Sequence, residues 1–147
     1  MFNKVAIIGL GLIGGSVAAG LKQRGLAKEV VAGVRSQRTL QQGLAHGYID
    51  SGSDDLAAVV QGADVVFVAV PVSAMEATFK AMAPGLGPNT IITDGGSVKA
   101  NVVNAARKRF TGGGTSPRGM LFVSSGLGDM SGAQAKAGNI SGVVSVI

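Results

Sequence analysis

The feature that most constrains the fold is a set of three glycines placed directly after a short apolar run. Gly9, Gly11 and Gly14 have the spacing Gly-x-Gly-x-x-Gly. The run that leads into them, residues 4–9, is almost wholly apolar and ends at Gly9 itself. Behind them, apolar residues recur at every fourth position up to Leu21. The run predicts a buried strand and the recurrence predicts a helix, so the glycines lie in a strand-to-helix turn.

From this turn to about residue 111, strand-like and helix-like segments alternate. The first helix is expected to pack Ile13, Val17 and Leu21 on the sheet and to end near Gly25. We expect further strands at residues 29–34, 64–70 and 90–93, and helices at residues 39–45, 54–60, 74–83 and 100–110. Such alternation predicts βαβ units with right-handed crossovers. The predicted fold class is therefore α/β, a doubly wound parallel sheet of the Rossmann type.

Beyond residue 111 the composition changes. Residues 112–117 resemble a loop, and the remainder is rich in Gly, Ser and Ala. Strands at residues 120–123 and 142–147, around a helix near 131–137, are the expected elements. We expect residues 1–147 to form one dinucleotide-binding domain, in which residues 112–147 are a divergent or irregular tail.

The glycine spacing carries a chemical prediction. Gly9 allows a tight turn, Gly11 lets the backbone approach a pyrophosphate, and Gly14 allows close packing of helix on strand. The phosphates would then meet unpaired N–H groups at the positive end of the helix dipole. The alternative is that the glycines serve only a tight turn.

The residues after the second strand predict which dinucleotide binds. An acidic residue there favours NAD, but residues 34–38 read Val-Arg-Ser-Gln-Arg and contain no carboxylate. Arg35, Arg38 and the hydroxyl of Ser36 suit a 2′-phosphate. We therefore expect NADP to be preferred, with NAD as the alternative if both arginines are only solvated.

Two later segments fall where strands of this fold end. Val70 and Pro71 close the strand at residues 64–70, at the edge where open α/β sheets bind ligands. Ser97 follows the strand at residues 90–93 and is well placed to cap the next helix. Capping alone is the simpler interpretation of Ser97.

The composition excludes several classes of function. The net charge is +5, but the basic residues are scattered and aromatic residues make up 4% of the chain, so no nucleic-acid surface is expected. Lys4 and the uncharged run that follows it imitate a signal peptide, but the glycine spacing indicates a strand and helix instead. We thus expect no export and no membrane insertion. The absence of cysteine excludes a thiolate metal site and fits a cytoplasmic protein.

The sequence resembles the prephenate/arogenate dehydrogenase family. Residues 5–16 are similar to its opening, and residues 69–71 and 93–99 resemble its later signatures. The resemblance implies NAD(P)-dependent oxidative decarboxylation of prephenate or arogenate in tyrosine biosynthesis, with Ser97 near the nicotinamide and substrate. It implies that the cofactor lies against the following residues: Gly9, Leu10, Gly11, Leu12, Ile13, Gly14, Arg35, Val70 and Pro71.

Two departures from the family pattern limit this expectation. The family has a histidine in a Gly-His-Pro motif after the next strand, but residues 122–128 contain none, and the single histidine, His46, is expected at a helix end. The family's helical C-terminal domain has no counterpart in these 147 residues. We therefore expect a self-associating chain that binds cofactor but is catalytically incomplete.

Two alternatives remain open. The first is an oxidoreductase similar to β-hydroxyacid dehydrogenases, because residues 132–139 faintly resemble a loop of that family. The second is a non-catalytic nucleotide-binding module or a truncated product.

Overall fold

The computed structural model describes residues 1–95, 121–123 and 144–146 of the chain. The strands are β1 (Phe2–Ile8), β2 (Ala27–Gly33), β3 (Ser51–Ser53), β4 (Val65–Val68), β5 (Ile91–Asp94), β6 (Leu121–Val123) and β7 (Val144–Val146). The α-helices are α1 (Leu12–Gln23), α2 (Gln37–Ala45), α3 (Leu56–Val60) and α4 (Met75–Met82), and two short 3₁₀ turns, η1 (Val72–Ala74) and η2 (Ala83–Gly85), flank α4.

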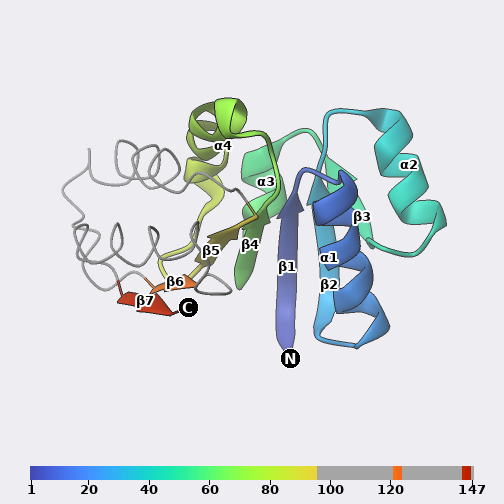
Figure 1. The fold of residues 1–147 in the computed structure, drawn as a ribbon, viewed down its shortest axis with the longest axis horizontal. Helices are drawn as coiled ribbons and strands as arrows, with labels where there is room; N and C mark the ends of the chain where they lie inside the picture. Colours follow the sequence, from blue (N-terminus) through green and yellow to red (C-terminus); the bar gives the residue numbers. More distant parts are fainter. Residues whose placement is uncertain (96–120, 124–143, 147) are drawn as a thin grey trace, which may run out of the picture.

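Five of the strands form one parallel sheet in the order β3-β2-β1-β4-β5 (Figure 1). β1 is central, and the chain moves outward from it first through β2 and β3 and then through β4 and β5. This order confirms the predicted doubly wound Rossmann-type sheet. β6 and β7 pair with each other, also in parallel. They lie within the segments expected to form the last two strands, residues 120–123 and 142–147.

The sheet has a separate apolar core on each face, because successive side chains of a strand point to opposite sides. Ala6 and Ile8 of β1 pack with α3 and α4, in a cluster that includes Phe79. Val5 and Ile7 pack on the opposite face, in the cluster that holds Ala18 of α1. β1 is therefore buried on both faces, as a central parallel strand should be.

Three expectations need correction. Ile13 was expected on the buried face of α1, but 56% of it is exposed, whereas Gly14 and Ala18 are buried. The strand expected at residues 64–70 is shorter, Val65–Val68, and its Val65 and Phe67 are only half-buried. β3 was not expected at all, because Ser-Gly-Ser has no strand-like composition; it forms by pairing with β2.

The remaining boundaries agree to within a few residues, and Gly47, with φ +67°, directly follows the C-cap of α2. The helices expected at residues 100–110 and 131–137 lie outside the described residues. Among the helices that are described, none is long and apolar enough to cross a membrane.

Candidate dinucleotide-binding site

The parallel strands bring four chain segments to one edge of the sheet. Gly9 follows β1, Val34 follows β2, Ala69 follows β4 and Gly95 follows β5. Backbone hydrogen bonds fix three of these segments to the adjacent strand. The N–H groups of Gly9, Ala69 and Gly95 donate to the carbonyl oxygens of Gly33 (2.9 Å), Ile8 (2.7 Å) and Val68 (3.0 Å). The predicted segments around Gly9, Arg35 and Val70 therefore meet at the carboxyl edge, where this fold binds its ligands.

Gly9 is required both by its backbone angle and by its surroundings. Its φ is +91°, a region that side chains disfavour, and a Cβ there would lie 2.5 Å from the Ala69 carbonyl oxygen. The same Cβ would lie 3.1 Å from Val70 Cγ1. The tight turn predicted for Gly9 is thus present, packed against the end of β4.

Gly14 allows α1 to rest on this turn. A Cβ on Gly14 would overlap the carbonyl oxygen of Gly9 and would lie 3.2 Å from Ile7 Cγ2. Gly14 is buried for this reason. The close helix-to-strand packing predicted for the third glycine is therefore observed.

Gly11 differs from the other two, because no steric requirement of the fold explains it. It precedes α1 with φ −77°, and a Cβ there would meet no atom of the described residues within 4 Å. No side chain in the described part of the chain caps α1, whereas Ser36 caps α2 and Asp55 caps α3. The first N–H groups of α1, those of Leu12 and Ile13, are thus left to an external acceptor, beside open space at Gly11. This arrangement fits a pyrophosphate.

The segment after β2 exposes two guanidinium groups. The side chains of Arg35 and Arg38 are exposed, and neither forms an ion pair within the described part of the chain. Ser36 accepts a hydrogen bond from the Thr39 N–H at 3.3 Å as the cap of α2. Its hydroxyl proton is not used by that bond and can still be donated.

The carboxyl edge of the sheet near β5 shows close approaches that were not predicted from the sequence. A Cβ on Gly95 would lie 3.3 Å from Ile13 Cγ2 and 3.2 Å from Phe67 Cζ. Ile13 therefore lies near Gly95 at the end of β5 and not in the core, and it is partly exposed there. Pro71 is exposed beside this region as the residue before η1.

The catalytic expectations are not tested by this geometry. Ser97 lies outside the described residues. His46 is the C-cap of α2, exposed as expected, and its ring stacks on Tyr48. No group of three or more His, Cys, Asp or Glu side chains that could hold a metal ion is found within residues 1–95 or the two short strands.

Sequence comparison agrees with this geometry. Residues 17–116 match the family model described as "Prephenate dehydrogenase, nucleotide-binding domain". The chain belongs to this family. It is 40% identical over 103 residues to cyclohexadienyl dehydrogenase of Zymomonas mobilis, a match that covers 70% of this chain and 35% of that protein. The chain spans about a third of the length of the curated relatives it matches.

Solved structures share the fold of this family member. Synechocystis arogenate dehydrogenase superposes with a TM-score of 0.68 at 23% identity, over 97% of this chain and 58% of that one. Prephenate dehydrogenase of Aquifex aeolicus, solved with hydroxyphenyl propionate and NAD+, gives a TM-score of 0.65 at 19% identity, over 99% of this chain and 59% of that one. At these identities the likeness concerns the fold alone.

The end of the chain has a second similarity. Residues 90–147 match a model described as "Urocanase Rossmann-like domain". This family differs from the β-hydroxyacid dehydrogenases that residues 132–139 faintly resemble. The match covers less than half of the chain and overlaps the first model over residues 90–116.

Proposed function

We propose that this chain binds a nicotinamide dinucleotide at the carboxyl edge of its sheet and prefers NADP to NAD. The residues proposed to hold it lie in the glycine turn, after β2, and at the end of β4. They are Gly9, Leu10, Gly11, Leu12, Ile13, Gly14, Arg35, Ser36, Arg38, Val70 and Pro71, to which we add Ser97 near the nicotinamide.

The observation that carries this proposal is the contrast between Gly11 and its two neighbours. Gly9 and Gly14 are explained by the turn itself, but Gly11 borders open space beside the uncapped start of α1. A side chain at Gly11 would cost the fold nothing, so its absence supports a close ligand. Backbone N–H groups at a helix N-terminus suit a pyrophosphate, which carries negative charge.

The preference for NADP rests on the charges after β2. Residues 34–38 contain two arginines and no acidic residue. A carboxylate there would accept hydrogen bonds from the ribose of NAD and repel a 2′-phosphate. Guanidinium groups at Arg35 and Arg38 would instead form charge-assisted hydrogen bonds with that phosphate.

We further propose that the domain serves the oxidative decarboxylation of prephenate or arogenate. A bound nicotinamide would supply the hydride acceptor. The chain would contribute orientation through the glycine turn and a polar group at Ser97. Serine is a poor base at its ordinary pKa, and His46 lies at the far end of α2. We therefore propose that these 147 residues bind cofactor without appreciable turnover.

One assay tests both parts of the proposal. NADP and NAD are titrated into the purified chain, and prephenate or arogenate is then added while reduced cofactor is followed by absorbance. We expect saturable binding, tighter for NADP, and negligible reduction of cofactor. Failure of either nucleotide to bind would refute the first part; turnover of a few per second that Ser97→Ala abolishes would refute the second.

A further inference from the structure

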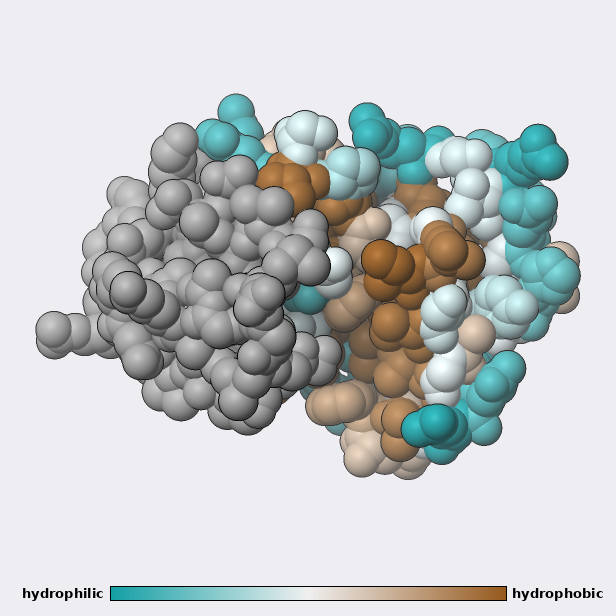
Figure 2. Space-filling view, viewed as in Figure 1, coloured by the Kyte–Doolittle hydropathy of each residue, from teal (hydrophilic) through white to brown (hydrophobic). Residues whose placement is uncertain are grey.

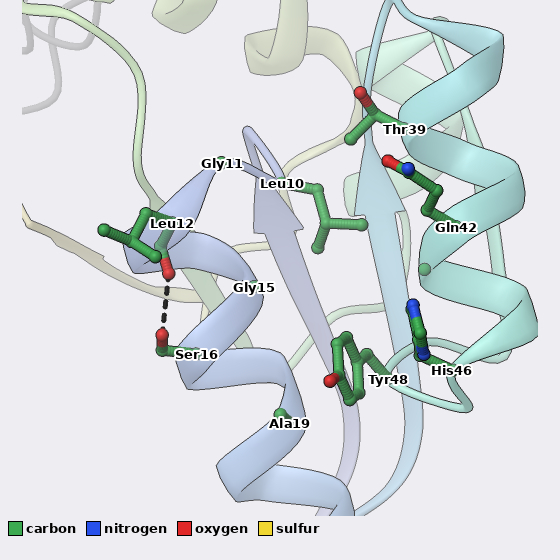
Figure 3. A pocket seen from close by; sticks show the side chains of 11 residues that line it. Leu10, Gly11, Leu12, Gly15, Ser16, Ala19, Thr39, Gln42, His46 and Tyr48 are labelled. Carbon is green, nitrogen blue, oxygen red and sulfur yellow. Dashed lines mark hydrogen bonds between the residues drawn. The ribbon is translucent and has the colours of Figure 1, made fainter.

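A groove lies between α1 and α2, on the face of the sheet away from α3 and α4 (Figure 3). Its volume is about 430 Å³. It starts beneath the glycine turn, at Leu10 and Gly11, and continues along both helices to Tyr48. The dinucleotide proposed above would lie across the carboxyl edge of the sheet, so most of this groove has no role in that proposal.

Below Leu12, the wall of the groove on α1 consists of small residues. α1 presents Gly15 and Ala19, and a Cβ on Gly15 would meet no atom of the described chain within 4 Å. α2 presents Thr39, Gln42 and His46 on the opposite side. The small residues of α1 are therefore what keeps the groove open.

Two aromatic rings close the lower end. Tyr48 and His46 stack with their centroids 5.3 Å apart and their planes at 22°. Tyr48 is half-buried, and its ring lies below Leu10 between the two helices (Figure 3). Leucine and tyrosine thus give the groove an apolar base of the kind that ring-containing ligands contact.

Part of the hydrogen-bonding capacity of the groove is unused. The lining that the described residues provide contains no Asp, Glu, Lys or Arg. The Ser16 hydroxyl donates a hydrogen bond to the Leu12 carbonyl oxygen at 2.7 Å. The amide of Gln42 and the hydroxyl of Thr39 form no hydrogen bond with any of the described residues, so they can pair with a ligand.

We propose that this groove is a second small-molecule site, which binds a neutral compound with a planar ring and a hydrogen-bonding edge. The small residues of α1 admit a flat ring, Leu10 and Tyr48 supply apolar contact, and Gln42 supplies both a donor and an acceptor. Among the described residues, the lining offers an ion no carboxylate, ammonium or guanidinium group. This site does not depend on the dinucleotide proposal, because none of these contacts needs a bound nucleotide.

The test uses the whole chain without nucleotide, labelled with ¹⁵N, and two probes with the same amide group. Benzamide has a planar ring, and cyclohexanecarboxamide has a puckered one. We expect benzamide to cause saturable shifts of the amide signals of Gly15, Gln42 and Tyr48, and cyclohexanecarboxamide to bind at least about fivefold more weakly. Equal binding of both probes, or shifts centred on Gly9 and Val70 instead, would overturn the proposal.

A matched pair of variants locates the site. Gly15→Leu fills the groove, whereas Gly20→Leu makes the same change on α1 outside it; a Cβ at either position meets nothing within 4 Å. Leucine also favours a helix over glycine, so both variants should fold. Gly15→Leu should weaken benzamide binding by about tenfold or more, and Gly20→Leu should leave it unchanged. Gln42→Ala should weaken it several-fold. Undiminished binding by Gly15→Leu would refute the site.

Discussion

Leu10 and Gly43 touch so closely that no methyl group fits between them. A Cβ on Gly43 would lie 2.6 Å from Leu10 Cδ2 and 3.0 Å from Ile49 Cδ1. Leu10 stands between Gly9 and Gly11 in the glycine turn, and Gly43 is buried in α2. The position of α2 and the conformation of the turn are therefore linked by one side-chain contact.

This contact gives a first prediction. Gly43→Ala should lower the free energy of unfolding by about 1–3 kcal/mol, because Leu10 or α2 must shift to accommodate the methyl group. Adding Leu10→Ala should recover part of that loss, since the shorter side chain vacates the space. Chemical denaturation of both single variants and the double variant measures the coupling, and strictly additive effects would show that the two residues do not interact.

The charges after β2 give a second prediction. Arg35→Asp should reverse the cofactor preference, because it removes charge-assisted hydrogen bonds of about 1.5–3 kcal/mol and places a carboxylate where the 2′-phosphate would lie. Dissociation constants for NADP and NAD are compared in the native chain and the variant. Lys28→Asp, the same kind of charge change within β2, is the control. Equal affinities for both nucleotides in the native chain would contradict this account.

The start of α1 leads to a third prediction, on association. Leu12 is 90% exposed and Ile13 is 56% exposed, and apolar residues gather on this face of the molecule (Figure 2). Exposed apolar patches mark interaction surfaces, so we expect the chain to self-associate. Leu12→Lys should weaken the association, whereas Leu44→Lys on α2 should have little effect. Light scattering that shows a monodisperse native monomer at high concentration would count against it.

Asp50 gives a fourth prediction, on pH. Burial alone would raise its pKa, but hydrogen bonds from Lys22 (2.6 Å) and the Val30 N–H (2.8 Å) and the charge of Lys22 outweigh it, so the pKa lies below its ordinary value of 3.8. A depressed pKa in the folded state stabilises the fold above the ordinary pKa, and this contribution disappears as the pH falls through the folded value.

Asp50→Asn should therefore cost about 0.5–1 kcal/mol at neutral pH, a small figure because the pair is partly exposed. The difference from the native chain should shrink as the pH drops below about 4. Denaturation at several pH values measures it, with Asp54→Asn as the control, since Asp54 forms no ion pair in the described part of the chain. A difference that does not change with pH would exclude the ion pair as its cause.

Local patterns in the sequence predicted much of this fold. The glycine spacing indicated the turn, and the positive φ of Gly9 and the close contacts of Gly14 with Gly9 and Ile7 involve residues that are near one another in the chain. The apolar run of β1 and the alternation of segments indicated a parallel sheet. These features depend on contacts within one βα unit, which a short stretch of sequence contains.

Features that depend on distant parts of the chain were not predicted. β3 forms because Ser51–Ser53 pairs with β2, not because of its composition. Gly43 is required by Leu10, more than thirty residues earlier, and Ile13 leaves the core to approach Gly95 after β5. The site residues remain predictions, and Ser97 is outside the described part of the chain.

The most direct test of the central claim is the affinity of Gly11→Val for NADP, measured by calorimetry beside the native chain. Because φ at Gly11 is −77° and a Cβ meets no atom within 4 Å among the residues that the structure describes, the variant should fold, which circular dichroism and thermal unfolding would verify. The branched side chain should nevertheless obstruct the pyrophosphate and abolish binding. We predict saturable NADP binding by the native chain and none by the folded variant. Undiminished binding by a folded Gly11→Val variant would place the dinucleotide site elsewhere.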